Sequence, residues 1–460
     1  MNMIAQKNEE DKLLGTISTF MHQYRIGELL AKCNAYKEKG VSVVILFTFM
    51  LRMAFADRSV YMQMRTGRWS EAFKKNTYYR FLNSAKVNWE RFLSLLSFRI
   101  IDEVFRPLTS DERKDVFIVD DSLYERAGYK KTELCARVFD HAKMRYTKGY
   151  RLLTLLWSDG NSSIPIGQRL LSSVNDKQIL GTTPVSDGRT LSGKRRLQAC
   201  RKGTDVMIEL LRDALKFGHR AKYVLFDSWF SAPKQLKDVK ALGLDSIAMI
   251  KKSGKIHYRW NGERLDIRQI YSRNKKRRGR SRYLLSVNVA IEVDGTSIPA
   301  KIVCVRNRSN RKDWLAIIST DTNLSEDEII RIYGKRWDIE VFFKVCKSYL
   351  KLMSECHCLS YDALTAHTVI VFTRYMLLSV QQRSEVDDRT LGDLFLAMVD
   401  ELADISFAHS FDLIMAAMFE CVRELFGASE EQITRLSDAM ISKLPAYMQV
   451  CLQKYAISCA

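Results

Sequence analysis

The sequence predicts an α/β protein, in which a mixed sheet covered by helices carries a β-rich insert between two helical end regions. Short apolar runs of strand character alternate with helical segments in the middle of the chain, and this order is typical of α/β folds. Of the 460 residues, 47% are hydrophobic, so a sizeable core can form and global disorder is excluded. The length favours two to four domains.

Residues 1–110 are predicted to be helical and form a possible DNA-end-binding region. Residues 12–110 contain one proline, Pro107, and their apolar residues are interrupted by basic and polar ones. The segment Asn76–Leu82 opens either a DNA-contacting helix or an ordinary packed helix with a solvated basic face.

Residues 111–250 are predicted to form the first part of the catalytic domain. Val116–Val119 is an apolar run that ends in Asp120 and Asp121, which predicts a buried strand with carboxylates at its end. The further elements expected here are strands at Arg151–Trp157 and Pro165–Leu171, a helix over 198–217, a strand at Tyr223–Phe226 before Asp227, a helix from Ala232 and a strand at Ser246–Ile250.

Residues 251–320 break this rhythm and predict a basic, β-rich insert. Arg282–Val293 and Ile298–Val305 are expected to be long strands, because Asp294–Gly295 between them is a strong hairpin signal. Trp314–Ser319 is expected to be a third strand. Within the next region, 321–355, a single helix is expected from Ser325 to about Lys351, and residues 356–460 are expected to form several more helices.

The formal net charge of +20 favours a polyanionic partner, either nucleic acid or an acidic membrane surface. Residues 251–282 contain 13 Lys or Arg against 2 Asp or Glu, whereas residues 348–460 contain 8 against 15. The acidic region 356–460 is therefore expected to bind protein and not DNA, through homodimerisation, the alternative being that it only packs on the catalytic domain.

The sequence does not predict a membrane protein. The start Met1–Glu10 is polar, and there is no uninterrupted apolar run of the roughly 18 residues that a spanning helix requires. A cytoplasmic, nucleoid-associated protein of a prokaryote is expected. The ten cysteines are scattered and only Cys356 and Cys358 lie close, around His357, which favours reduced thiols over a zinc site.

Two acids follow apolar strands, Asp120 and Asp227, and open α/β sheets usually place ligands at such strand ends. Phosphodiester cleavage commonly uses two metal ions about 4 Å apart, and hard cations prefer carboxylate oxygens. Each aspartate taken alone could equally be a turn or helix cap.

A third acid lies in the helix expected after the insert. Tyr333, Arg336, Glu340 and Lys347 fall within an arc of roughly 80° on an ideal helix, and Lys344 joins that face. The apolar residues Trp337, Val341, Phe342, Val345 and Tyr349 lie on a different arc that can pack on the sheet edge. The alternative is an ordinary amphipathic helix with charge pairs four residues apart.

The segment YGKRWDIEVFFKVCK at 333–347 matches the signature Y-(2)-R-(3)-E-(6)-K at all four positions. VDDS at 119–122 and LFDSWF at 225–230 match two further landmarks, and the three acids are separated by 107 and 113 residues. In these segments, over roughly residues 75–350, the chain resembles DDE transposases of the family named for insertion sequence four.

This resemblance implies a ribonuclease-H-like catalytic domain whose metal ligands are Asp120, Asp227 and Glu340. Two Mg²⁺ ions are expected, with Mn²⁺ able to substitute. The expected partners are double-stranded DNA of the transposon terminal inverted repeats and of the target. The implied activity is cut-and-paste transposition, and the alternatives are another nuclease of the same fold or a domesticated, non-catalytic DNA-binding protein. Side chains expected to contact DNA phosphates are Tyr333, Arg336, Lys344 and Lys347.

Three assignments stay open. Asp120 is favoured over Asp121 as the first acid, because Ser122 then occupies the third position of a D-x-S/T pattern. Trp314 is either a core residue on a strand or, as the resemblance implies for members that form DNA hairpins, a platform for a flipped base. A cluster in the insert is expected to contact the DNA backbone, unless it is only a solvated basic face; it comprises Lys275, Lys276, Arg277, Arg278 and Arg280.

Overall fold

The computed structural model describes residues 13–55, 59–66, 71, 73–109, 114–140, 143–278, 281–307, 310, 313–384, 391–450 and 452. Contacts divide the chain into two compact units. Unit 1 comprises Met1–Ile26, Val44–Glu71 and Gln382–Ala460, and unit 2 comprises Gly27–Val43 and Ala72–Gln381. The boundary expected at residue 356 falls within unit 2.

Unit 2 is built on one mixed sheet, which has 11 strands within the described residues. The strand order is β2-β3-β1-β5-β6-β11-β10-β9-β7-β8, and β4 pairs with β3. The strands are β1 (Val116–Glu125), β2 (Ala136–Asp140), β3 (Arg145–Ser158), β4 (Ser163–Leu171), β5 (Tyr223–Phe226), β6 (Asp245–Met249), β7 (His257–Trp260), β8 (Glu263–Asp266), β9 (Leu285–Val293), β10 (Thr296–Arg306) and β11 (Trp314–Ser319).

The centre of the sheet is parallel. β5 pairs in parallel with β1 on one side and with β6 on the other. All four residues of β5 are buried, as are the first four of β1, which is expected for strands that helices cover on both faces. The remaining pairs are antiparallel, including β1 with β3 and β11 with β6.

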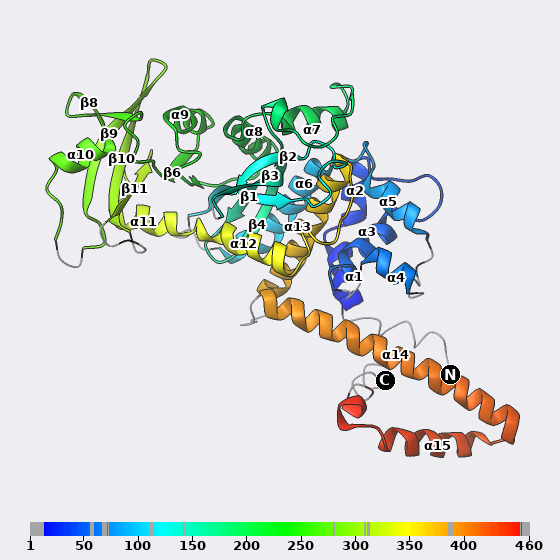
Figure 1. The fold of residues 1–460 in the computed structure, drawn as a ribbon. Helices are drawn as coiled ribbons and strands as arrows, with labels where there is room; N and C mark the ends of the chain where they lie inside the picture. Colours follow the sequence, from blue (N-terminus) through cyan, green and yellow to red (C-terminus); the bar gives the residue numbers. More distant parts are fainter. Residues whose placement is uncertain are drawn as a thin grey trace. The chain divides into compact units, whose positions relative to one another are not determined.

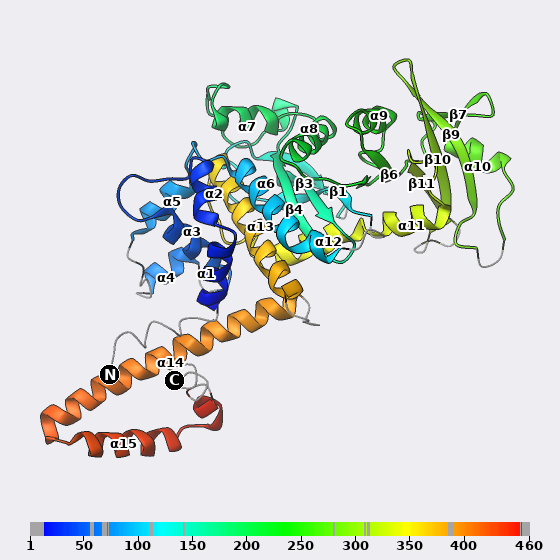
Figure 2. The same ribbon diagram turned by 180° about the vertical axis from the view of Figure 1, so that it is seen from behind.

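Helices cover the two faces of the sheet separately, with α8 and α9 on one side and α11 and α12 on the other (Figures 1 and 2). The same strands are contacted from both sides, because β4 packs against α8 and α12, and β6 packs against α9 and α11. We call the side under α11 and α12 the catalytic face. The helices named so far are α8 (Gly203–Lys216), α9 (Pro233–Ala241), α11 (Glu326–Gly334) and α12 (Trp337–Ser348).

The other described helices of unit 2 pack around this layer. They are α2 (Ile26–Lys32), α5 (Lys75–Leu82), α6 (Trp89–Ile100), α7 (Leu191–Ala199), α10 (Ile267–Arg273) and α13 (Tyr361–Ser384), and a π-helical turn, Ile101–Phe105, continues α6. By length and composition α13 could cross a membrane, but 94% of its apolar window is buried inside the protein. Its Arg374 is fully buried and pairs with Glu355, so α13 is a core helix.

Unit 1 is helical in its described part. It contains α1 (Leu13–Gln23), α3 (Val43–Arg52), α4 (Val60–Arg65), α14 (Leu391–Phe426) and α15 (Glu430–Ser442). Phe55 packs against Phe395 of α14, with ring centroids 5.3 Å apart. Further along α14, Ile414, Leu425 and Phe426 are exposed.

The α/β fold class is confirmed, and β5 and β11 have the predicted bounds. The single helix expected from Ser325 to Lys351 is wrong. Ser325 does cap a helix, but that helix ends at Gly334, and α12 begins only at Trp337. Lys335 in the break donates to the backbone oxygens of Lys114 and Asp159, at 2.8 and 3.0 Å, and so anchors the turn. The sequence did not predict β2, α7, β7, β8 or α10.

Candidate active site

The register of two neighbouring parallel strands brings Asp120 and Asp227 together. Val116–Val119 of β1 pair residue by residue with Tyr223–Phe226 of β5, so Asp120 and Asp227 are the next two positions in register. Adjacent strands lie about 4.8 Å apart, and residues in register point to the same face. Asp120 does not end its strand as predicted, because β1 continues to Glu125 along β3; it marks where the parallel pairing ends.

The neighbouring acids Asp120 and Asp121 point to opposite faces, as successive strand residues must. Asp121 makes two hydrogen bonds to the guanidinium of Arg151, and its side chain is only 9% exposed. Asp120 lies on the catalytic face, where its Oδ2 accepts from Arg336 Nη1 at 3.3 Å. Of the two, Asp120 is therefore the acid that shares a face with Asp227.

Glu340 reaches the same place from α12. Arg336 Nη2 donates to Glu340 Oε1 at 2.7 Å, so one guanidinium bridges Glu340 and Asp120. The side chain of Glu340 is 41% exposed, whereas that of Arg336 is 13% exposed. Asp120 of the sheet and Glu340 of α12 are thus joined through the Arg336 guanidinium.

Tyr333 lies in the last turn of α11 and Lys347 in the last turn of α12. Tyr333 is buried, and burial raises the pKa of its hydroxyl, with the Asp227 and Asp120 carboxylates acting in the same direction. Lys347 Nζ donates to Ser122 Oγ at 2.5 Å, and burial lowers the pKa of this amine. All four residues of the Y-R-E-K signature therefore lie on the catalytic face.

The other helix residues divide differently from the prediction. Lys344 is exposed, which suits a contact with DNA. Phe342 and Val345 are buried as expected, but Trp337 and Val341 are 61% and 53% exposed and do not pack on the sheet. The buried face of α12 is formed by Ile339, Phe342, Phe343, Val345 and Cys346, and at 100° per residue Trp337 and Val341 lie on the other side of the helix.

The electrostatics of the acid pair are those of a crowded anionic site. The pKa of Asp120 is raised to about 7, chiefly by burial and then by the Asp121 and Asp227 carboxylates, against the lowering effects of the Asp121 backbone N–H and of Arg336. Asp227 is half-buried, and its Oδ1 accepts from the backbone N–H of Ser228 at 2.5 Å. A nearby positive charge would favour the ionised pair.

These acids fit a divalent cation in part. Within the part of the chain that the structure describes, no three His, Cys, Asp or Glu side chains are grouped as ion ligands are. Asp120 and Asp227 nevertheless supply the carboxylate oxygens that hard cations prefer, and a cation would relieve their mutual repulsion. Glu340 is separated from Asp120 by the Arg336 guanidinium, which bonds to both carboxylates. Arg336 would have to move for Glu340 to become a third ligand.

The insert presents the predicted basic cluster on its surface. Lys275, Arg277 and Arg278 are exposed, and Lys276 Nζ lies 4.6 Å from the centre of the Tyr271 ring. Arg280 lies outside the described residues. The half-buried Trp314 stacks on Tyr271 with ring centroids 4.1 Å apart and planes 11° apart. One ring face of Trp314 is therefore already covered by an aromatic side chain.

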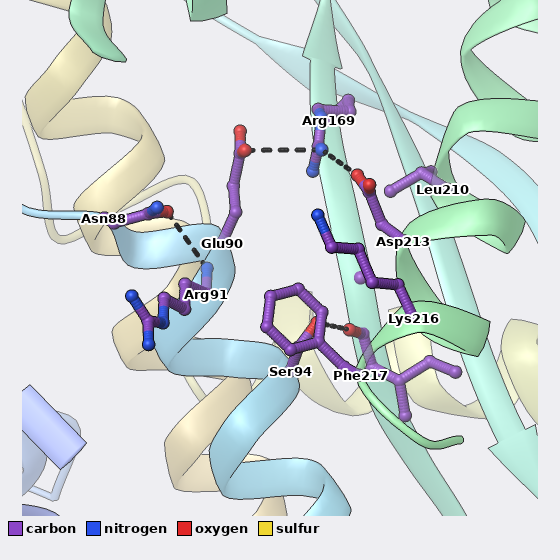
Figure 3. Close-up of a pocket in the computed structure, with 11 residues that line it drawn as sticks. Asn88, Glu90, Arg91, Ser94, Arg169, Leu210, Asp213, Lys216 and Phe217 are labelled. Atoms are coloured by element: carbon purple, nitrogen blue, oxygen red, sulfur yellow. Dashed lines mark hydrogen bonds and ion pairs between the residues drawn. The ribbon is translucent and has the colours of Figure 1, made fainter. Parts of the chain in front are cut away.

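A separate cavity lies on the opposite face of the sheet, between α6, α8 and β4 (Figure 3). Arg169 in it pairs with Glu90 at 3.3 Å and with Asp213 at 3.1 Å. Arg169 is thus paired with two carboxylates, and the cavity contains none of the three acids.

A comparison with known protein families shows which family the chain belongs to. The model of a family described as DDE superfamily endonuclease matches residues 44–312, more than half of the chain. The chain belongs to this family. No curated protein matches it.

As a DDE superfamily endonuclease, the chain is a nuclease-type enzyme with DNA as its substrate, and enzymes of this superfamily generally use divalent metal ions. The matched residues include Asp120 and Asp227 but end before Glu340. Ribonuclease-H-like architecture agrees with both the family and the sheet.

Some residues around the site of this endonuclease were missed or only partly anticipated. Arg151 was expected as the first residue of a strand, yet it neutralises Asp121. Ser122 was used only as a pattern position, yet it binds Lys347. Cys356 and Cys358 are buried free thiols, and the described residues around them form no group of metal ligands.

Proposed function

We propose that this DDE endonuclease is a cut-and-paste transposase of the kind named for insertion sequence four, with Asp120, Asp227 and Glu340 as its acids. One observation carries the proposal: strand register sets Asp120 beside Asp227, and Arg336 links Glu340 to the same point. The wider signature supports it, since Lys347 binds Ser122 of the first acidic motif.

In this mechanism Asp120 and Asp227 hold divalent ions, Mg²⁺ or Mn²⁺ and two in number, with Glu340 as the third ligand. When bound, such ions activate water or a 3′-hydroxyl and stabilise the charge of the phosphodiester transition state. When Arg336 no longer pairs with Asp120 and Glu340, its guanidinium binds a DNA phosphate through two hydrogen bonds. Lys347 and the exposed Lys344 attract phosphates as point charges. The basic cluster of the insert holds the DNA backbone.

The reaction we propose is hydrolysis at the transposon terminal inverted repeats, followed by attack of the freed 3′-hydroxyl on target DNA. Two ends must be held together, so we propose a homodimer that pairs through α14, whose exposed Leu425 and Phe426 suit a protein partner. A cytoplasmic, nucleoid-associated location follows from that substrate. A domesticated DNA-binding protein would not need all three acids.

The test is incubation of the full chain with cloned DNA that flanks its gene, in Mg²⁺ and in EDTA. We expect double-strand breaks at the element ends in Mg²⁺ only, and a native gel with two differently labelled ends should show both labels in one complex. Cleavage at internal sites without preference for the ends would favour the other nuclease, and end binding without any cleavage would favour the domesticated protein.

A further inference from the structure

Two polar side chains beside Asp120 are buried without any hydrogen-bond partner among the described residues. They are Thr154 on β3, which is 0% exposed, and Gln168 on β4, which is 1% exposed. The hydroxyl of Thr154 and both amide atoms of Gln168 lack partners. Buried polar atoms are nearly always hydrogen-bonded, so these three call for an explanation.

The sheet places these side chains in one row with the acids. Asp120 is directly opposite Thr154 in the antiparallel pair β1–β3, and Thr154 is directly opposite Gln168 in the pair β3–β4. Directly opposed residues share a face, with Cβ atoms about 4.5–5.5 Å apart. The row Gln168–Thr154–Asp120 therefore continues across the catalytic face to Asp227.

The surroundings of this row are apolar or already paired. Along β3, Thr154 lies between Leu152 and Leu156 on the same face, and both leucines are fully buried. Ser158, further along that face, donates to Asp338 of α12 at 2.6 Å, so α12 reaches this face of β3. A valine at position 154 would have the shape of threonine and leave nothing unsatisfied, whereas an unpaired hydroxyl costs about 1–3 kcal/mol.

A buried water would satisfy all three atoms. Such waters typically make two to four hydrogen bonds to groups that would otherwise be unsatisfied. The Thr154 hydroxyl, the Gln168 amide and the Asp120 carboxylate, on adjacent strands, supply that number of partners.

We propose that Thr154 and Gln168 are positioning residues that, through a buried water, orient the Asp120 carboxylate toward the ion it shares with Asp227. The inference rests on the proposed function and extends it to side chains that touch neither DNA nor metal. Outer partners of this kind typically change metal affinity or activity 10–100-fold when removed.

The experiment measures Mn²⁺ binding to the full chain without DNA, by titration calorimetry. We expect Thr154→Val to weaken binding by about tenfold or more, and Thr154→Ser, which keeps the hydroxyl, to stay within about threefold of the unmodified protein. Thr154→Val should unfold in EDTA at nearly the same temperature, because valine has the shape of threonine and the water keeps its bonds to Gln168 and Asp120. A residue with a merely structural role would not show weaker binding with intact stability.

Ser246→Ala is the matched control, because Ser246 also has a buried hydroxyl without a partner, on β6. Its register with Val224 puts it on the face opposite Asp227. We expect this variant to bind Mn²⁺ normally. Gln168→Met, measured in the same way, should weaken binding and decides the question if Thr154→Val does not fold.

The outcomes separate this inference from the proposed function. If Asp227→Asn loses Mn²⁺ binding while Thr154→Val and Gln168→Met bind normally, the positioning role is overturned and the acid site stands. If Thr154→Ser loses as much as Thr154→Val, packing and not the hydroxyl is responsible, which also overturns it. If Asp227→Asn binds Mn²⁺ normally, the proposed function itself fails.

Discussion

The sheet side and the helix side of the candidate site are held in place by different forces. Asp120 and Asp227 are positioned by the backbone hydrogen bonds of β1 and β5, which fix their register. Glu340 is positioned by a side-chain ion pair to Arg336 at 2.7 Å and is 41% exposed. Register is set for a whole strand at once, whereas a partly exposed ion pair is worth little and can be exchanged for another charge.

This difference suggests that Asp120 and Asp227 have fixed positions, whereas the position of Glu340 can change. Arg336 can exchange Asp120 and Glu340 for a DNA phosphate, since guanidinium groups bind both kinds of anion in the same forked way. The exchange would free both carboxylates when substrate arrives. The sheet side has no comparable freedom, because β5 is fully buried.

The largest effect is expected from removing a carboxylate charge. Asp120→Asn, Asp227→Asn and Glu340→Gln should each lower the rate of end cleavage at least about a thousandfold, or about 4 kcal/mol in the barrier. Specific end binding should remain nearly intact, because the basic contacts are untouched. Rates come from denaturing gels and binding from mobility shifts of the same labelled end. Near-normal cleavage by Asp227→Asn would remove the basis of the site.

A smaller effect should separate the two sides directly. Asp227→Glu moves a carboxylate by one methylene directly after the buried strand β5, and a misplacement of about 1 Å can cost about a hundredfold in rate. Glu340→Asp makes the equivalent change on the helix side and should cost about tenfold or less. The same cleavage assay with both variants checks this. Equal losses would mean that α12 is as rigidly placed as the sheet.

The contrast also explains how much the sequence could predict. Asp120 and Asp227 each follow an apolar run, and such runs predict buried strands, but only the resemblance to a transposase family distinguished these acids from turn or helix caps. The pairing of Asp121 with Arg151 could not be anticipated, since it depends on the register between β1 and β3. The break after Gly334 was missed because Lys335 is held by backbone oxygens of Lys114 and Asp159, which are distant in the sequence.

The pH dependence of stability should reveal the crowding of the acids. With the pKa of Asp120 raised to about 7, the folded state keeps a proton that the unfolded state loses near pH 4. The stability contributed by this group is therefore present below about pH 4 and is lost as the pH rises to about 7. Asp120→Asn does not titrate, so its stability advantage over the unmodified protein should grow across that window.

A rise in pKa from about 4 to about 7 corresponds to roughly 4 kcal/mol of stability. We expect the advantage of Asp120→Asn to reach only about 2 kcal/mol at pH 8 in EDTA, because Asp120 is 21% exposed and paired with Arg336. Urea unfolding from pH 4 to pH 8 measures it. Added Mg²⁺ should stabilise the unmodified protein and narrow the gap. A difference that stays constant over the whole range would contradict the raised pKa.

The smallest effect on catalysis is expected at Asp121, the immediate neighbour of Asp120. Asp121 lies on the opposite face and its charge is matched by Arg151, so Asp121→Asn should leave end cleavage within about threefold of normal at a temperature where the protein is folded. Its effect should appear in stability instead, because removing one partner of a mostly buried ion pair leaves the other unmatched. About 1–3 kcal/mol is expected, less than for a fully buried pair, because Arg151 remains 27% exposed. The double variant Asp121→Asn, Arg151→Met should regain part of that loss, since no unmatched charge remains. If Asp121→Asn is folded but inactive and Asp120→Asn is active, Asp121 is the first acid. The active site would then not lie on the face under α12.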